Sequence, residues 1–569
     1  MKKLPIGVSN FEDMMKGNYY YVDKTLLIKD IIDLSGEVKL ITRPRRFGKT
    51  LNMDMLFRFF SMDERQDLFE GLKIWEERSL VKDHYHSYPV LLISFREVKD
   101  VDWASASRHL KVILSNFAKD YLDLKVDESS KKILKRLAER EASMEEYADV
   151  FRFLTELLYR VKGKKSVILI DEYDVPIESA YAYRHRVPDY YDNMTAFMRG
   201  LLTAALKDNP YLAFGILTGV YRVAKESIFS GLNNLAVYTV FDSEMPDRFG
   251  FTEEEVNEML KHYGLGKEDK KVVDEWYGGY GIGNVENLYN PWSVLNYIRS
   301  RVEGENPPSR SAQTYWINTS SNDLIIEQIK NSRNVKMEID RLLEGKEVQL
   351  TVDPWLSLRD LERRKDGVWV LFANGGYLTA RWIRSSKYAF KIPNEEVLSF
   401  FKTTVIEWIE ERTNAEIFRM LDELDRMLNE GEYEEFAKRL ESFIESGLSY
   451  YDVAKSESER FYKGFLLGIL AIAVNGYKVE SELESGYGRL DVVIYPKDKS
   501  FGRYAAIFEV KRSDDEGRLE KLAKEAFDQI KEKKYYVKMK EKGYKVIGFG
   551  IAFCGKRVRM IAALVGQGK

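Results

Sequence analysis

The stretch that decides the fold of the C-terminal region reads Gly488-Arg489-Leu490-Asp491 and, after an apolar run, Phe508-Glu509-Val510-Lys511. Its β-rich runs predict two adjacent strands that bring Asp491, Glu509 and Lys511 to one point. Glu509 and Lys511 are two residues apart, so they project to the same face of a strand. Carboxylates are the hard oxygen ligands that Mg²⁺ prefers, and a lysine beside them can contact a metal-bound water or a phosphate. The stretch therefore predicts a metal site beside a phosphodiester, although strand-end acids and an edge lysine also occur by chance.

A second stretch, Arg43-Pro44-Arg45-Arg46-Phe47-Gly48-Lys49-Thr50, follows a short strand-like run at 38–41. Apolar residues recur at helical spacing after Thr50, so we expect the loop to open a helix whose amides face it. The order Gly-Lys-Thr matches the end of a Walker A loop, in which the lysine binds phosphate oxygens and the hydroxyl binds Mg²⁺. Arg43 stands where that motif has its first glycine, whose backbone geometry other residues adopt only at a cost. The loop predicts nucleotide binding through Lys49 and Thr50 and leaves fast hydrolysis open.

Two further apolar runs complete this N-terminal pattern. Residues 166–172 read Ser-Val-Ile-Leu-Ile-Asp-Glu, which is typical of a buried parallel strand that ends in two acids. At that position Asp171 would hold the Mg²⁺ shell and Glu172 would polarise an attacking water. Residues 213–219 form another such run. Strands that alternate with helices predict a parallel α/β sheet over residues 1–245.

Composition bounds the organisation and the partners of the chain. At 569 residues, and with roughly 150 residues per domain, we expect several modules. The 88 basic and 91 acidic residues leave a net charge of −3, which removes the cationic signature of a passive nucleic-acid coat. The single cysteine, Cys554, excludes an intramolecular disulfide framework and a multi-cysteine zinc site. No secretory signal follows Met1, and the apolar run at 464–474 is shorter than the roughly 20 residues of a membrane span. We therefore expect a soluble cytoplasmic protein with no membrane partner.

Changes in sequence pattern divide the chain into four regions. They are an α/β domain, a helical and small α+β region, a layer of connecting helices and a last α/β module, at 1–245, 246–395, 396–454 and 455–569. Thr252 is the predicted N-cap of the first helix of the second region, with Glu255 as its capping-box partner.

The last module resembles the PD-(D/E)XK nuclease superfamily, whose core is a helix followed by strands that carry Asp on one strand and Glu-x-Lys on the next. The resemblance implies that the two strand acids, Asp491 and Glu509, bind the metal. It implies five catalytic residues in this module: Asp491, Glu509, Lys511, Glu459 on the first helix and Gln529 on a later helix. Lys463 stands where the superfamily often has a histidine.

The N-terminal region resembles the AAA-ATPase-like domain that is fused to PD-(D/E)XK nucleases in bacteria and archaea. The matching phrases are the loop at 43–50, Leu169-Ile170-Asp171-Glu172-Tyr173-Asp174, Thr218-Gly219, the run at 224–234, Trp276-Tyr277-Gly278-Gly279-Tyr280 and Tyr289-Asn290-Pro291-Trp292. The resemblance implies a multidomain α/β protein: a P-loop NTPase sheet with a helical lid, joined to a restriction-endonuclease-like α/β domain. It also implies ATP binding by Arg46, Gly48, Lys49, Thr50, Asp171 and Thr218, with Thr50 and Asp171 on Mg²⁺ and Glu172 as a catalytic residue. Arg222 would lie one helical turn beyond Thr218, and two interpretations of it remain: a γ-phosphate sensor that binds the nucleotide, and an ion pair with an acidic side chain.

Together these patterns predict a Mg²⁺-dependent nuclease that cleaves nucleic-acid phosphodiester bonds and is regulated by ATP in its N-terminal domain. DNA is favoured over RNA as the substrate, and assembly as a homo-oligomer is compatible with this organisation. The alternative is a nucleotide-dependent switch or scaffold that binds nucleic acid without cutting it, which the net acidity favours. A third class, a structural partner protein, would bind no ATP.

Overall fold

The computed structural model describes residues 1–64, 67–222, 234–304, 306–317, 322–343, 345–356, 364–413, 417–450, 477–481, 484–485, 488–497, 502–555 and 557–566, with positions 358, 360, 463, 466 and 470. The chain forms two compact units. We call them the N-terminal unit (Met1–Ile325 and Gln349–Val397) and the C-terminal unit (Ile326–Val348 and Leu398–Lys569). The four region boundaries predicted from the sequence stay predictions.

The N-terminal unit is built on a parallel sheet of five strands, which confirms the predicted α/β architecture. The strand order is β2 (Val90–Ser94), β3 (Ser166–Asp171), β4 (Leu212–Gly219), β1 (Val38–Thr42) and β5 (Leu235–Tyr238). Every residue of β1 and β3 is buried, as expected of strands covered on both faces. The loop at 43–50 follows β1, which lies between β4 and the edge strand β5.

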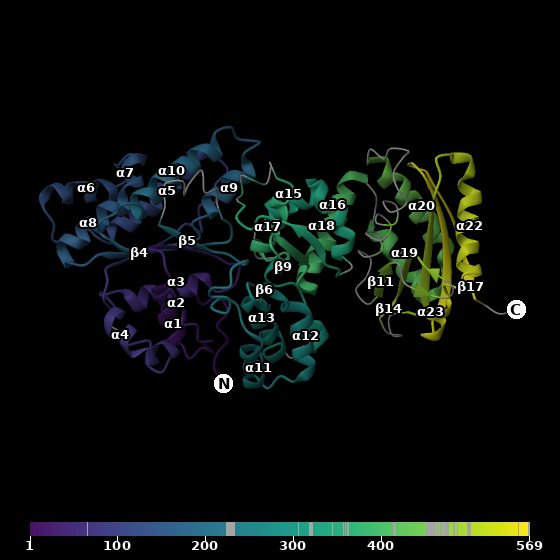
Figure 1. Cartoon of the computed structure of the whole chain (residues 1–569), viewed down its shortest axis with the longest axis horizontal. Coiled ribbons are helices and arrows are strands. Elements are labelled where there is room, and N and C mark those ends of the chain that lie inside the picture. The colour runs from purple at the N-terminus through teal and green to yellow at the C-terminus, as the bar shows by residue number, and fades with distance from the viewer. Residues whose placement is uncertain are drawn as a thin grey trace. The chain divides into compact units, whose positions relative to one another are not determined.

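Helices cover both faces of this sheet (Figure 1). On one side lie α1 (Phe11–Lys16), α2 (Leu27–Asp33), α3 (Lys49–Phe60) and α4 (Arg78–His84). On the other lie α5 (Trp103–Lys119), α6 (Glu128–Ala138), α7 (Met144–Ala148), α8 (Val150–Lys162), α9 (Val175–Tyr183) and α10 (Tyr190–Leu206). Helix α3 packs on β2 and β3, whereas α8 packs on β3 and α10 on β4. These layers hold the carboxyl ends of the strands, and the loops that follow them, along one edge.

The rest of the N-terminal unit is a helical region with small sheets. Its elements are α11 (Glu253–His262), α12 (Lys267–Tyr277), β6 (Tyr280–Ile282), β7 (Val285–Leu288), α13 (Pro291–Val302), α14 (Pro308–Ser311), α15 (Asp323–Asn331, which continues past the unit's boundary), β8 (Val348–Thr351), α17 (Gly367–Gly375), β9 (Thr379–Arg384) and β10 (Lys387–Lys391). The predicted cap of α11 is confirmed, because Thr252 and Glu255 form the reciprocal hydrogen bonds of a capping box. Its core joins α11, α12 and α13 through Val256, Tyr277 and Ile298.

The C-terminal unit is a mixed five-stranded sheet between two layers of helices. The strand order is β11 (Tyr477–Ser481), β14 (Val492–Pro496), β15 (Tyr504–Arg512), β16 (Lys545–Cys554) and β17 (Arg557–Val565). The helices are α16 (Arg333–Leu343), α18 (Glu395–Thr413), α19 (Ile417–Glu430), α20 (Tyr433–Tyr450), α22 (Leu519–Glu532) and α23 (Val537–Glu541), with a short ribbon of β12 (Glu484–Ser485) and β13 (Gly488–Arg489). Figure 1 shows α19 and α20 on one face of the sheet and α22 on the other.

Helix α22 lies unusually close to the sheet. A Cβ atom on Gly550 of β16 would come within 2.2 Å of the Ala523 carbonyl oxygen on α22. Glycine therefore permits the contact, and the close approach places the side chains of α22 directly over β15 and β16.

Candidate functional sites

The loop between β1 and α3 contains two residues with positive φ, and neither is Arg43, the first residue of the motif. Gly48, the N-cap of α3, has φ 83°, and Arg46 has φ 66°. Arg43 is not among the residues with positive φ. The arginine at the first motif position therefore needs no glycine geometry, and the backbone cost expected from the sequence does not arise there.

Arg43 is instead a buried anchor for the loop. Its guanidinium, with none of the residue's surface exposed, donates to the carbonyl oxygens of Thr42, Tyr238, Thr239, Glu244 and Met245 at 2.8–3.1 Å. Burial lowers the pKa of Arg43 to about 10, so it remains a cation at neutral pH. Because carbonyl oxygens accept from a charged donor strongly, this residue ties the loop to the segment after β5.

Lys49 closes the loop from inside. Its Nζ donates to the carbonyl oxygens of Arg43 at 3.0 Å and Pro44 at 2.8 Å. Burial lowers the pKa of Lys49, and the nearby charges of Glu172, Asp174 and Asp171 oppose that shift. A lysine with this placement can move from the loop carbonyls to phosphate oxygens without leaving the pocket.

Asp171 links three elements of the sheet edge. Thr50, in the first turn of α3, donates to Asp171 Oδ2 at 2.8 Å, and Thr218, near the end of β4, donates to Oδ1 at 2.6 Å. Asp171 is 1% exposed. A carboxylate and a hydroxyl in contact are oxygen donors that suit Mg²⁺ with waters and phosphate, so the residues present fit the ion.

Two further acids follow Asp171 in the turn after β3. Burial raises the pKa of Glu172, and the charge of Asp171 adds to this rise. The backbone of Glu172 is left-handed, with φ 51°. Burial also raises the pKa of Asp174 to about 7. Asp174 Oδ2 accepts from the backbone N–H groups of Val220 and Tyr221, each at 2.7 Å, so it holds the end of β4 against the turn.

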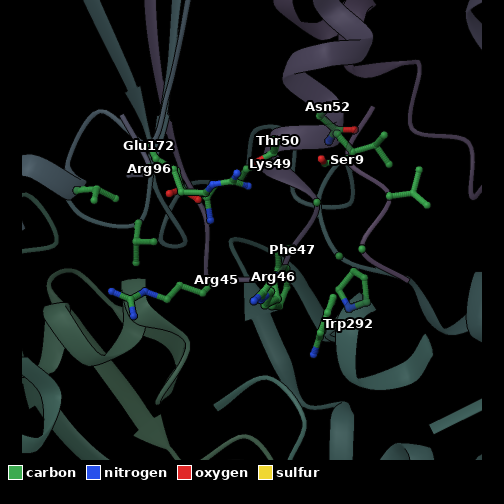
Figure 2. A pocket seen from close by; sticks show the side chains of 18 of the residues that line it. Ser9, Arg45, Arg46, Phe47, Lys49, Thr50, Asn52, Arg96, Glu172 and Trp292 are labelled. Atoms are coloured by element: carbon green, nitrogen blue, oxygen red, sulfur yellow. The ribbon is translucent and has the colours of Figure 1, made fainter. Parts of the chain in front are cut away.

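One cavity of about 760 Å³ is lined by Arg46, Gly48, Lys49, Thr50, Glu172 and Asp174, whereas Arg43, Asp171 and Thr218 are not among its lining residues (Figure 2). Its volume lies in the range of small-molecule sites. Arg45 forms an ion pair with Glu178 at 2.5 Å, and the Arg46 guanidinium lies 4.3 Å from the centre of the Trp292 ring. Other lining residues are Ser9, Tyr21, Asn52, Phe251 and Pro291. A cavity that combines phosphate-binding groups with apolar and aromatic walls fits a nucleotide.

Arg222 lies outside the lining of this cavity. Its Nη1 donates to the Trp355 carbonyl at 2.8 Å, and its guanidinium lies 5.1 Å from the Trp355 ring. Its role as a γ-phosphate sensor therefore stays a prediction, because the described contacts of Arg222 are with Trp355 and not with the loop. The structure places other side chains at the cavity that the sequence did not single out, among them Arg96, Lys99 and Asp174. The available signal for Arg96 was its position just after the apolar run Val90-Leu91-Leu92-Ile93.

The C-terminal acids come together as the sequence predicted. β14 and β15 are antiparallel, with Val492 opposite Phe508, so Asp491 just before β14 reaches the end of β15. Asp491 Oδ2 accepts from the backbone N–H of Val510 at 2.8 Å, and Lys463 Nζ lies 2.6 Å from Oδ1. The cation that stands in place of a histidine thus pairs with the first acid of the site.

Gln529, on α22, joins the other two residues. Its amide nitrogen donates to Glu509 Oε1, and its amide oxygen accepts from Lys511 Nζ at 2.8 Å. Tyr535 lies 3.3 Å from the same amide nitrogen. Glu509 and Lys511 lie on one strand face, and the close packing of α22 brings Gln529 between them. All four predicted catalytic residues that the structure describes in this unit, Asp491, Glu509, Lys511 and Gln529, therefore meet.

Glu509 has one oxygen that the described residues leave unused. The residue is 4% exposed, and its buried Oε2 has no hydrogen-bond partner in the described part of the chain. Burial raises the pKa of Glu509 to about 8, and the charge of Asp491 adds to this rise. An orphaned carboxylate oxygen beside a second carboxylate is the donor set for a divalent cation. Among the described residues no three His, Cys, Asp or Glu side chains gather for a metal. The predicted Glu459 lies outside the described residues.

Family models of known proteins match both an N-terminal and a C-terminal part of the chain. A family model described as a predicted AAA-ATPase matches residues 5–229, and one described as the PD-(D/E)XK nuclease superfamily matches residues 457–563. The chain is an AAA-ATPase-like domain joined to a PD-(D/E)XK domain. A relative from Azotobacter chroococcum mcd 1, named "Uncharacterized protein in vnfD 5'region", is 26% identical over 565 residues. The alignment covers 97% of this chain and 96% of the relative, so the similarity includes both domains.

The match to the AAA-ATPase-like family model ends at residue 229, but some residues that line the cavity come later in the sequence. Trp292 and Phe251 line that cavity but lie beyond residue 229. The PD-(D/E)XK match includes the four predicted catalytic residues that meet in the C-terminal unit. No helix among the described residues combines the length and the apolar character that crossing a membrane requires.

Proposed function

We propose that this protein is a Mg²⁺-dependent nuclease, cleaving DNA in preference to RNA, whose PD-(D/E)XK domain is regulated by ATP bound in the AAA-ATPase-like domain. The observation that carries the proposal is the buried, unpartnered Oε2 of Glu509 beside Asp491 and the Gln529–Lys511 pair. The buried free thiol of Cys554 is in keeping with a cytoplasmic protein.

Each residue of the C-terminal site has a distinct task in this proposal. Asp491 and Glu509 would hold Mg²⁺, which supplies a Lewis acid and a more acidic water when bound. Lys511, positioned by Gln529, would orient the attacking water and stabilise the negative charge that develops on the phosphate. Gln529 would also fix the rotamer of Glu509 through its amide nitrogen.

The N-terminal site supports binding of ATP. Lys49 would exchange its loop carbonyls for phosphate oxygens, and Thr50 with Asp171 would hold Mg²⁺. Glu172 would accept a proton from the attacking water if hydrolysis occurs. Regulation then needs only that the ATP-bound and ATP-free forms of the domain differ in their effect on cleavage.

A second function, binding of nucleic acid without cleavage, is favoured by one observation. The Lys463 ammonium lies 2.6 Å from Asp491 Oδ1, which is a carboxylate oxygen that a metal would use. A cation held there neutralises the acid without supplying a water for attack. Phosphodiester binding with no product in Mg²⁺ would favour this function.

The test is the Asp491→Ala variant assayed on single- and double-stranded DNA and RNA with Mg²⁺, with and without ATP. We expect cleavage by the wild type and loss of cleavage in the variant, while the far-UV circular dichroism and ATP affinity stay unchanged. Asp422→Ala, which removes an exposed acid from α19 in the same unit, is the matched control and should cleave normally. Undiminished cleavage by Asp491→Ala would reject the nuclease assignment.

A further inference from the structure

Seven cationic side chains line the nucleotide cavity, and most of them are already engaged. Lys49 donates to carbonyl oxygens of its own loop, and Arg46 lies over Trp292. The other engaged cations form ion pairs: Arg45 with Glu178, Lys24 with Glu255 and Arg248 with Asp30, at 2.5–2.7 Å. The three ion pairs hold the walls of the cavity together, so Arg45, Lys24 and Arg248 are committed to the protein, whereas Lys49 would exchange its loop carbonyls for phosphate oxygens.

Arg96 and Lys99 differ from the other five. Both are exposed, and neither side chain forms a hydrogen bond or an ion pair with any residue in the described part of the chain. An arginine offers five N–H donors in a planar fork that suits phosphate. Two exposed cations that line this cavity and have no partner among the described residues are available for a ligand.

The strand register explains why Arg96 lies at this point. β2 and β3 are parallel with Ser94 opposite Asp171, and the Phe95 N–H donates to the Asp171 carbonyl oxygen at 3.1 Å. The residues that follow each strand therefore emerge at the same edge, so Arg96 comes beside Glu172. Figure 2 shows Arg96, Glu172 and Lys49 together on one side of the cavity, away from Trp292.

The charges agree with this placement. Burial and Asp171 raise the pKa of Glu172, whereas the positive charges of Lys49, Lys99 and Arg96 act against that rise. Arg96 also contributes to the lowered pKa of Arg46, after burial, so it acts electrostatically on the phosphate-binding loop as well. The space between Lys49 and Glu172 is where the terminal phosphate of a loop-bound nucleotide would lie.

We propose that Arg96, assisted by Lys99, contacts the γ-phosphate of ATP from within the same chain and stabilises the charge that develops there. The inference rests on the proposed binding of ATP and adds the residue that reads the third phosphate. In hydrolysis the water oxygen bonds to the γ-phosphorus as the bond to the β–γ bridging oxygen breaks. The electron pair leaves on ADP, and the water proton goes to Glu172.

Arg96 thereby takes the role of γ-phosphate sensor that the sequence had suggested for Arg222. Arg222 is held by the Trp355 carbonyl and ring and does not line the cavity, whereas Arg96 lines it and has no competing partner among the described residues. Because Arg96 belongs to the same chain as Lys49, turnover per chain should not depend on protein concentration.

The experiment measures affinity for MgATP and MgADP by calorimetry in the full-length wild type, Arg96→Gln and Lys99→Gln. Arg96→Gln should weaken ATP binding about tenfold and leave ADP binding unchanged, because one charge-assisted phosphate contact is lost. Its kcat for ATP hydrolysis should fall at least about 100-fold, which is below the range for arginine fingers. Lys99→Gln should show smaller effects in the same direction. Arg152→Gln, an equal charge change on the exposed side of α8, should change neither.

The outcomes separate this inference from the function on which it rests. If the wild type binds neither nucleotide, the proposed ATP site is wrong and this inference falls with it. If the wild type binds both but Arg96→Gln keeps the wild-type preference for ATP over ADP, only the Arg96 assignment is overturned. An equal loss of ATP and ADP affinity would also overturn it, since Arg96 would then act on the cavity as a whole.

Discussion

In the AAA-ATPase-like domain, each oxygen of Asp171 accepts a hydrogen bond from a threonine, whereas in the PD-(D/E)XK domain Glu509 keeps one buried oxygen without a partner. In the first site the Asp171 carboxylate is fully hydrogen-bonded by the chain, and a ligand would bind by replacing these hydrogen bonds. In the second site the unpartnered oxygen of Glu509 favours binding of a cation, since burying a polar atom without a partner costs about 1–3 kcal/mol. Different ligand dependence should follow for the two domains.

The largest expected effect concerns the unmet oxygen. Glu509→Gln should lower Mg²⁺-dependent cleavage about 1,000-fold, because an amide removes the charge that binds the ion and replaces a carboxylate oxygen by a donor nitrogen. ATP affinity should not change. Cleavage is measured on labelled DNA, and Glu532→Gln on the exposed side of α22 is the control. A variant that retains cleavage would remove Glu509 from the metal site.

The matching change in the first domain is Lys49→Ala. It should weaken ATP binding about 100-fold, since it removes the buried cation that, in the proposed function, contacts phosphate with charge-assisted bonds. Calorimetric titration gives the affinity, with the exposed Lys132→Ala as control. Cleavage without ATP should remain, because the two sites use different residues. Equal ATP affinity in Lys49→Ala and wild type would favour the structural-partner class.

Asp174 gives the first domain a pH dependence. Its pKa is about 7 in the folded chain and near 3.8 when unfolded, so the folded state binds more protons between these values. The free energy of unfolding should therefore fall by about 2 kcal/mol as pH rises from about 5 to about 7. In Asp174→Asn this decrease should be absent, whereas the exposed Asp192→Asn should retain it. Denaturant unfolding at several pH values measures the difference, and parallel slopes would contradict the prediction.

The smallest expected effect tests the support of Glu509. Gln529→Leu should lower cleavage about tenfold, because Lys511 and Glu509 lose the amide that orients both. The loss should appear mainly in kcat, with substrate binding retained. A change confined to KM would show that Gln529 contacts the substrate rather than orienting the two charged residues.

Much of both sites could be predicted because short motifs fix their local structure. In a parallel sheet, the strand that ends in Asp171 and the loop that ends in Lys49 and Thr50 lie at the same edge, where the strands have their carboxyl ends. The Glu-x-Lys spacing likewise places Glu509 and Lys511 on one face of a strand.

The position of Arg96 beside Glu172 could not be predicted in the same way, because it depends on which strands pair and in which register. The prediction for Arg222 assumed a helical turn between Thr218 and Arg222, but these described residues form none, and the Arg222 side chain contacts Trp355. The role of Arg43 also escaped the pattern, since its five carbonyl partners lie on segments up to 202 residues away in sequence.

Arg43 shows how a departure from a consensus can be what the fold requires. An engineer who restored glycine at this position, to make the loop match the usual motif, would leave five backbone carbonyls without their common donor. The repaired motif would belong to a less stable protein, because buried acceptors would lose their partners and the chain would gain backbone freedom in the unfolded state.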